Sequence, residues 1–170
     1  RRRCKWRHYK GTRKNLDAIR IVGRRNSYGP MNNTPIPHAD FDAFIEKRTK
    51  ASDAFVNGEY TPLGEVSTQV SPATIFGPPG TCVQGAEQVN AVNSQSADHF
   101  KPGSENAFET MHSGSSCDLA YWVGIQRSVA HMRGQEKSVP MNLRVTELFR
   151  REDGAWKLFH RHADILKEGK

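Results

Sequence analysis

The chain has 170 residues, 36% of them hydrophobic, which suits one domain with a core of its own. The formal net charge is +7, but residues 1–30 hold eleven Lys or Arg and the single acid Asp17, so they carry +10 and the other 140 residues carry −3. The positive charge therefore lies in residues 1–30 alone, and it points to a nucleic-acid partner only for the N-terminal arm and not for the rest of the chain, the body.

The arm, residues 1–37, shows no sustained apolar period and ends in a stretch rich in Pro and Asn. One interpretation is that Met31 is the natural start and that residues 1–30 are upstream or added sequence. The other is a native nucleic-acid-binding or targeting arm. We expect the first, with a single domain over residues 38–166 and a short tail at 167–170. Nucleic acid is then a partner only if the arm is native.

The cysteine pattern bears on the cell compartment. Cys4, Cys82 and Cys117 are odd in number and form no C-x-x-C pair, as in proteins of a reducing compartment. No stretch approaches the roughly 18 apolar residues that cross a bilayer, and no secretory signal is evident. We expect a cytoplasmic protein that makes no membrane contact.

Three helices are predicted in the first half of the body. Between about residues 40 and 57, core-type positions recur at steps of three and four, with Asp40 as a candidate cap and Gly58 as the stop: Phe41, Phe44, Ile45, Arg48, Ser52, Phe55 and Val56. A short second helix follows Pro62. A third is predicted within GAEQVNAVNSQSADHF.

Strands fill the rest of the body. VSPATIF is predicted to be a strand that stops at the turn GPPG, residues 77–80. NAFETMH is predicted to end at the following GSS, and three further strands lie in DLAYWVGIQRSVAHMR, VPMNLRVTELFRR and WKLFHRHAD. In the longest of these, Tyr121 and Trp122 fall on opposite faces. The order predicts an α+β fold with helices early and an antiparallel meander late.

Two motifs carry a family resemblance that covers about residues 38–166. The G-P-x-G turn with the helix start after it (Gly77–Val89) and the ending R-x-D-G-x-W-x-L-x-H-x-H (Arg151–His162) resemble the nuclear transport factor 2-like superfamily, in its SnoaL-like polyketide cyclase and ketosteroid isomerase-like branch. The ending is also similar to that of the association domain of calcium/calmodulin-dependent kinase II, which builds oligomers.

The resemblance implies a cone-shaped, curved antiparallel sheet wrapped on about three helices, with a pocket between sheet and helices, and a homodimer. Members include isomerases, cyclases, dehydratases and non-enzymatic binding or assembly modules, so the fold alone does not determine function. Where steroid isomerases place a catalytic aspartate, the first strand here offers Ser71 and Thr74, which argues against steroid isomerisation.

The closing strand carries the candidate site. His160, His162 and Asp164 alternate, so a strand points all three to one side. The string is similar to the metal motif H-x-H-x-D-H, but Ile165 replaces the last His and few residues follow. A zinc site with both histidines and a third group stays geometrically open, although we expect no metal.

The hairpin register decides which neighbours His160 meets. If Asp153 and Gly154 form a two-residue turn, Glu147 lies opposite His160 and Val145 opposite His162. A three-residue loop instead places Thr146 opposite His160 and Arg144 opposite His162. The first register predicts a carboxylate and imidazole dyad, and the second a cationic site for an acidic or enolate ligand.

We therefore expect a pocket that binds a small organic molecule, in a homodimer, without metal or cofactor. The predicted chemistry is that of an isomerase, cyclase or dehydratase. Its predicted catalytic residues are His160 and Glu147, and its predicted ligand-binding residues are Arg144, His162, Trp122 and Asp164. The alternative is a non-catalytic ligand-binding or oligomeric association domain, in which the same polar residues are structural.

Overall fold

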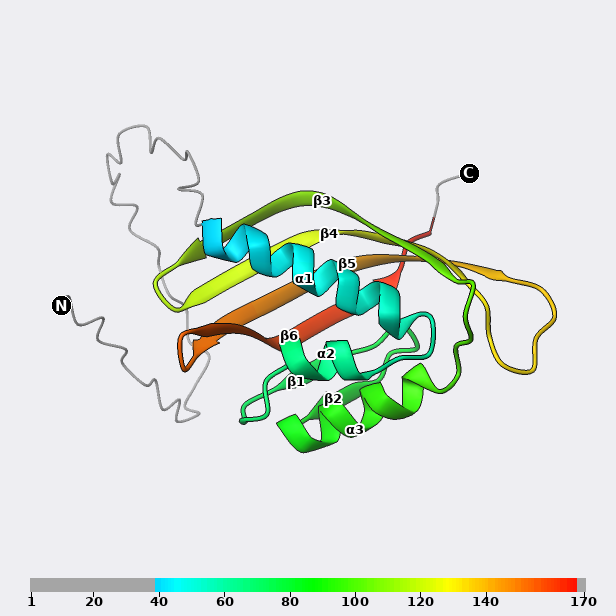
Figure 1. The fold of residues 1–170 in the computed structure, drawn as a ribbon, viewed down its shortest axis with the longest axis horizontal. Helices are drawn as coiled ribbons and strands as arrows, with labels where there is room; N and C mark the ends of the chain where they lie inside the picture. Colours follow the sequence, from blue (N-terminus) through cyan, green and yellow to red (C-terminus); the bar gives the residue numbers. More distant parts are fainter. Residues whose placement is uncertain (1–38, 168–170) are drawn as a thin grey trace, which may run out of the picture. The chain divides into compact units, whose positions relative to one another are not determined.

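The computed structural model describes residues 39–167 (Figure 1). The predictions for the arm at residues 1–37, including the start at Met31, lie outside the described residues, as does most of the tail. The described part contains three α-helices and six strands in the predicted order, with one strand more than expected. No helix within it combines the length and the apolar character needed to cross a membrane.

The three helices begin and end where local chemistry favours it. Helix α1 (Ala39–Phe55) carries Asp40 and Asp42 in its first turn, where the positive end of the helix dipole favours acids. Helix α2 (Thr61–Val66) has a proline in its first turn, and α3 (Ala86–Ala97) follows Gly85. The turn after α1 ends at Gly58, whose φ of 91° favours glycine.

The strands form one curved sheet in the order β2-β1-β6-β5-β4-β3 (Figure 1). Strand β1 pairs parallel to β6, and every other pair is antiparallel. The bounds are β1 (Thr74–Phe76), β2 (Cys82–Gln84), β3 (Glu105–Ser116), β4 (Leu119–Ala130), β5 (Val139–Glu152) and β6 (Ala155–Ile165). The late antiparallel meander and the α+β class are confirmed.

Three strand predictions needed correction. The strand predicted over VSPATIF begins only at Thr74, so β1 has three residues. Strand β3 does not stop at GSS but continues to Ser116, and the turn falls at Cys117, whose φ is 51°. Pairing with β4 therefore overrides the weak strand propensity of Gly114, which lies against the ring of Tyr121. Strand β2 was missed because three residues are too few to show an alternating pattern.

The β5–β6 hairpin follows the predicted two-residue-turn register only next to its turn, and neither predicted register holds beyond Phe149. The two-residue turn at Asp153 and Gly154 is confirmed, with φ angles of 50° and 82°, and Arg151 pairs with Trp156. A β-bulge then intervenes, so that His160 pairs with Leu148. The expected pairings of His160 with Glu147 or Thr146 are wrong.

The bulge has a packing reason. Leu158 and Ala163 are both buried in the same core cluster, yet they are five positions apart, an odd step that strict alternation cannot place on one face. One extra residue at Phe159 restores both to the core face. The same shift places Arg161 opposite Glu147.

We call the face of the sheet that packs against α1 the inner face. Phe41 of α1 makes edge-on contacts with Phe149 and Trp156, at centroid distances of 5.5 and 5.3 Å. Leu143 and Val145 add buried apolar surface there. This core fixes α1 on the sheet and leaves room farther along, where α3 and β1 form the other walls of a pocket.

Arg150 holds the segment that leads into β1. Its guanidinium donates to the carbonyl oxygens of Pro72 (2.9 Å) and Val70, and to Oγ1 of Thr68 (2.9 Å). Glu152 accepts from its Nε at 2.6 Å. One side chain of β5 thereby satisfies several polar groups of a segment that has no ladder of its own.

Candidate functional site

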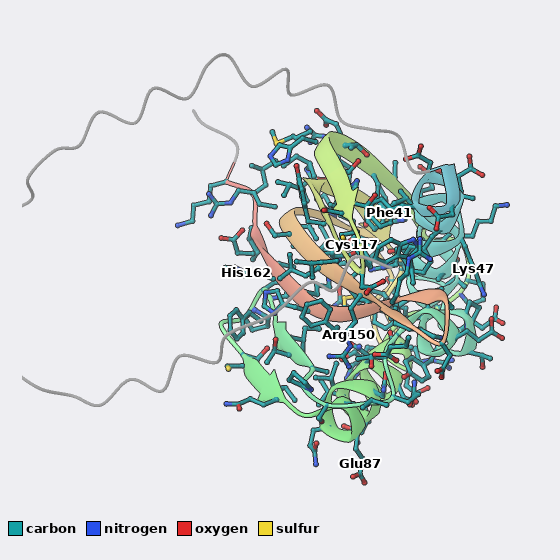
Figure 2. All side chains as sticks on the ribbon, turned by 90° about the vertical axis from the view of Figure 1, so that its left-hand side faces the viewer. Phe41, Lys47, Glu87, Cys117, Arg150 and His162 are labelled. Carbon is teal, nitrogen blue, oxygen red and sulfur yellow. The ribbon has the colours of Figure 1, made fainter. Side chains whose placement is uncertain are left out.

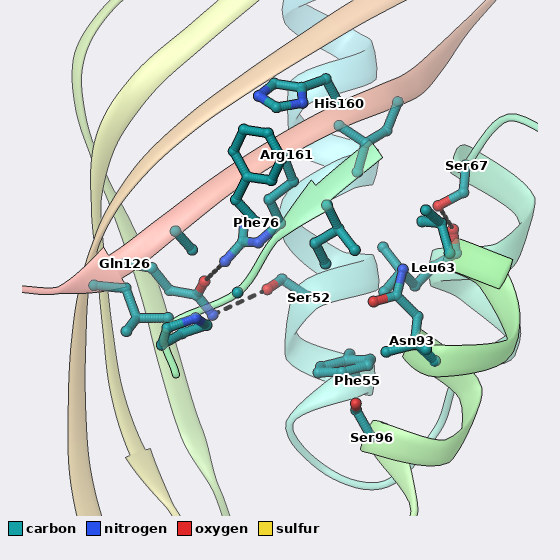
Figure 3. A pocket seen from close by; sticks show the side chains of 18 of the residues that line it. Ser52, Phe55, Leu63, Ser67, Phe76, Asn93, Ser96, Gln126, His160 and Arg161 are labelled. Carbon is teal, nitrogen blue, oxygen red and sulfur yellow. Dashed lines mark hydrogen bonds between the residues drawn. The ribbon is translucent and has the colours of Figure 1, made fainter. Parts of the chain in front are cut away.

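A cavity of about 320 Å³ lies between α1, α3, β1 and the inner face of the sheet (Figure 3). This volume falls within the range of small-molecule sites. Most of its lining is apolar, from residues that include Phe55, Leu63, Ile75, Val89, Leu143 and Leu158. A few polar side chains interrupt this wall, and they set its chemistry.

The polar end of the cavity lies where Arg161 points inward from β6 (Figure 3). Its Nη2 donates to Oε1 of Gln126 at 2.5 Å, and Nε2 of Gln126 donates to Oγ of Ser52 at 3.3 Å. These three side chains come from β6, β4 and α1. Strand pairing and helix packing therefore bring together groups that lie far apart in the sequence.

Glu147 lies behind this polar end, with only 1% of its side chain exposed. Its Oε1 accepts from Nη2 of Arg48 at 2.6 Å and from Nη1 of Arg161 at 2.5 Å. Burial alone would raise the pKa of Glu147, but the two guanidinium charges outweigh it and hold that pKa below its usual value. The carboxylate therefore stays charged and is a weak base.

A second layer of hydrogen bonds holds Gln126 in place. Its Nε2 also donates to Oδ1 of Asn106 at 2.7 Å, and Ser128 donates to the same oxygen at 3.0 Å. Nδ2 of Asn106 donates in turn to Asp53 of α1 at 2.8 Å. Because Gln126 is fixed from both sides, its amide oxygen is held toward Arg161.

Asn93 of α3 is the polar group on the opposite wall. Its side chain points into the cavity (Figure 3), and only 8% of the residue is exposed. No side-chain hydrogen bond to another described residue satisfies its amide. Its amide therefore faces the cavity with donors and an acceptor that a bound molecule or water can use.

His160 lies at the rim of the same cavity, with its ring turned away from Arg161 (Figure 3). Its Nδ1 is 2.6 Å from Oγ1 of Thr74, and its ring meets Phe76 edge-on at 5.2 Å. Burial, together with the neighbouring His162, lowers the pKa of His160 below its usual value. The imidazole is therefore neutral at neutral pH.

The other predicted site residues do not line this cavity. Arg144 and Asp164 form an ion pair on the outer face of the sheet, with Nε to Oδ1 at 2.9 Å. His162 lies on the side away from Lys47 of α1 (Figure 2). Trp122 is 1% exposed in the core and donates to Oγ1 of Thr110 at 2.8 Å.

The expected same-face run of His160, His162 and Asp164 does exist, but the bulge places it on the outer face, and of the three only His160 lines the cavity, at its rim. Phe76 contacts both histidine rings. Across residues 39–167, no three His, Cys, Asp or Glu side chains gather in a way that could hold a metal ion. The zinc alternative thus lacks a third ligand among the described residues.

Sequence reasoning missed the inward polar groups Arg161, Gln126 and Asn93. Arg161 was hidden because its inward direction depends on the bulge. Arg48 did leave a signal, since it occupies a core-type position in the period of the first helix. An arginine at such a position needs a buried acid as a partner.

We predict that Glu147→Gln lowers the free energy of unfolding at pH 7 by about 3–5 kcal/mol, because it leaves the buried guanidinium of Arg48 and the partly buried one of Arg161 without their carboxylate. Glu109→Gln is the matched control. Glu109 pairs with Arg127 at the surface, and such an exposed ion pair contributes about 0–1 kcal/mol to the free energy of unfolding. Urea unfolding measures both. Equal losses in the two variants would show that the buried pair does not stabilise the fold.

The same comparison has a pH dependence. Because the folded-state pKa of Glu147 is lowered, its contribution is complete above the usual carboxyl value of 4.5 and is lost as pH falls through the folded-state value. The gap between wild type and Glu147→Gln should therefore narrow below about pH 4.5.

Residues 49–166 match the family model of the SnoaL-like domain. No functionally curated protein matches the sequence significantly. The solved structures that resemble it include a proposed dehydratase of the NTF2-like family from Streptomyces avermitilis, with a TM-score of 0.62 and 17% identity over 76% of this chain and 98% of that one.

A proposed scytalone dehydratase from Novosphingobium aromaticivorans also has a TM-score of 0.62, with 9% identity over 76% of this chain and 83% of its own. The CamKII hub homology domain of Chlamydomonas reinhardtii has a TM-score of 0.57, with 16% identity over 75% of this chain and 98% of its own. At these identities the likeness shows the fold alone. With the family model matching most of its length, the chain belongs to the SnoaL-like domain family of the NTF2-like, cystatin-like fold.

Proposed function

We propose that this SnoaL-like chain binds a small, largely apolar organic molecule in the cavity between α1, α3 and the sheet. The observation that carries the proposal is the cavity itself, about 320 Å³ in volume, with an apolar wall and a few converging polar groups. Sites of this size and composition are typical of small-molecule pockets. Asn93 supports the proposal, because its amide faces the cavity and makes no hydrogen bond to another described side chain.

The proposed chemistry is proton exchange at His160, as in a cofactor-independent isomerase, cyclase or dehydratase. A neutral imidazole can accept a proton at neutral pH, and the contact with Thr74 fixes the ring and leaves Nε2 for a substrate. Glu147 no longer has the role of a base in this proposal. Its low pKa and its two arginine partners suit a residue that positions Arg161.

A second candidate role is assembly, which the proposal includes in the form of a homodimer. The outer face of β4 exposes Leu119, Tyr121 and Val129, about 40% or more in each case. Exposed apolar residues on a sheet face are a feature of protein interfaces, although the charged Arg127 lies between Tyr121 and Val129 on this face. The likeness to a CamKII hub homology domain shows the shared fold and supports assembly only as a proposal.

The pocket can be tested by filling it. Ser96 lines the cavity, whereas Ser94 on the same helix does not. We predict that Ser96→Phe abolishes binding of the neutral fluorescent probe N-phenyl-1-naphthylamine, and that Ser94→Phe leaves it unchanged. Equal binding by both variants and wild type would place the probe elsewhere and contradict the proposed pocket.

The state of His160 can be tested without a known substrate. We predict that its NMR titration gives a pKa below the ordinary value of 6.5, and that His162→Ala moves this pKa upward, because one neighbouring positive charge is removed. Burial of the ring should still hold the pKa of His160 below 6.5 in this variant. A pKa above 6.5 in the wild type would make the ring cationic near neutrality and would contradict its role as proton acceptor.

The homodimer can be tested by light scattering after gel filtration. We predict twice the chain mass for the wild type and the mass of one chain for Val129→Lys, since a lysine on the outer face cannot be buried without a partner. Val70→Lys is the matched control, because Val70 is exposed but lies between α2 and β1. A dimer that persists in Val129→Lys would exclude this face as the interface.

A further inference from the structure

We propose that the ligand of this pocket is an organic acid, whose carboxylate binds at Arg161 and whose apolar body extends toward α3, with a second oxygen at Asn93. The inference rests on the proposed small-molecule pocket and adds the class of molecule. It concerns groups that the proton chemistry at His160 does not use.

The first support is the charge of the lining. Two arginines line the cavity, Arg48 and Arg161, whereas no aspartate or glutamate among residues 39–167 does so. Glu147 neutralises one of the two charges, but it is buried behind them and does not line the cavity. A ligand therefore meets one net positive charge in an apolar enclosure, where attraction for an anion is much stronger than in water.

The second support is an excess of donors at this end. Nη1 and Nη2 of Arg161 each use one N–H, for Glu147 and Gln126, and a guanidinium has five. Its side chain is 15% exposed, and it points into the cavity (Figure 3). Behind it, Nε and Nη1 of Arg48 are buried without an acceptor, so they add positive charge rather than donors that a ligand can reach. A carboxylate supplies acceptors only, in the planar shape that a guanidinium binds best.

The third support lies on the opposite wall. Asn93 is 8% exposed, its side chain points into the cavity, and its amide has no partner among the described residues (Figure 3). Apolar side chains such as Ile75, Val89 and Leu143 lie along the wall that the two polar ends share. The arrangement fits an acid with an apolar middle and a hydroxyl or carbonyl oxygen at its far end.

Matched acids and amides test the carboxylate. Phenylacetate, 3-phenylpropionate and indole-3-acetate would each be titrated against the corresponding primary amide by calorimetry at pH 7. We expect at least one acid to bind about tenfold or more tightly than its amide, as for a hydrogen bond to a charged group. Added salt should weaken the binding of the acid and leave the binding of the amide unchanged.

Variants locate the effect. Arg161→Met should remove the preference for the acid, whereas Arg144→Met should keep it, because Arg144 lies on the outer face of the same sheet. If Arg161→Met fails to fold, the guanidinium NMR signal of Arg161 in the wild type gives the same information. That signal should shift with the acid and not with its amide.

A second pair tests Asn93. The phenol of 3-(4-hydroxyphenyl)propionate is remote from its carboxylate, and we expect this acid to bind about fivefold more tightly than 3-phenylpropionate, as for one neutral hydrogen bond. Asn93→Leu should abolish that difference and retain the acid preference. An unchanged difference in Asn93→Leu would overturn the second contact.

The outcomes separate the two proposals. Equal affinity for acids and amides, or no binding of either by a protein that binds N-phenyl-1-naphthylamine, overturns the organic-acid inference and leaves the pocket. If neither the acids, nor the amides, nor N-phenyl-1-naphthylamine binds, the proposed pocket function itself is contradicted. Acid preference that persists in Arg161→Met at wild-type strength would also overturn the inference.

Discussion

The structure depends on one buried carboxylate held between two guanidiniums. Glu147 of β5 joins Arg48 of α1 to Arg161 of β6, so one acid connects a helix and two strands. A carboxylate this deeply buried is tolerated only with such partners. By holding both arginines, it also determines which charge the pocket presents. Fold and site therefore share this one group.

The β-bulge at Phe159 makes that contact possible. Without the extra residue, Arg161 would point to the outer face and His160 would lie opposite Glu147. The core requires the bulge because Leu158 and Ala163 are both buried. Apolar packing thus selects the register, and the register in turn selects which polar side chains enter the pocket.

The sequence predicts the helices, the meander and the family well, because helical spacing, D-G turns and the G-P-x-G motif are local signals. The bulge has no local signal of that kind. It depends on which residues of β6 the helices cover, and that is a property of tertiary packing. The inward polar groups come from separate elements, so no short motif contains them. Arg48 was visible in the helical period, but its partner Glu147 lies 99 residues away.

The arginines on the inner face, rather than the histidines of β6, set the charge of the pocket. His160 keeps a place at the rim, held by Thr74, whereas Arg144 and Asp164 pair on the far side of the sheet. The solved structures that share this fold include a proposed dehydratase and a CamKII hub homology domain, so the fold alone leaves the function open. The charge and the unpaired donors of this particular pocket carry the functional argument.

The most direct test of the central claim is a carbon-13 NMR titration of the Glu147 carboxyl group. We expect a pKa clearly below the ordinary glutamate value of 4.5, and an upward shift in Arg161→Met, which removes one of its two cations. A value at or above the ordinary one in the wild type would mean that burial outweighs the arginines. The carboxylate would then not hold them, and the proposed polar end of the pocket would be contradicted.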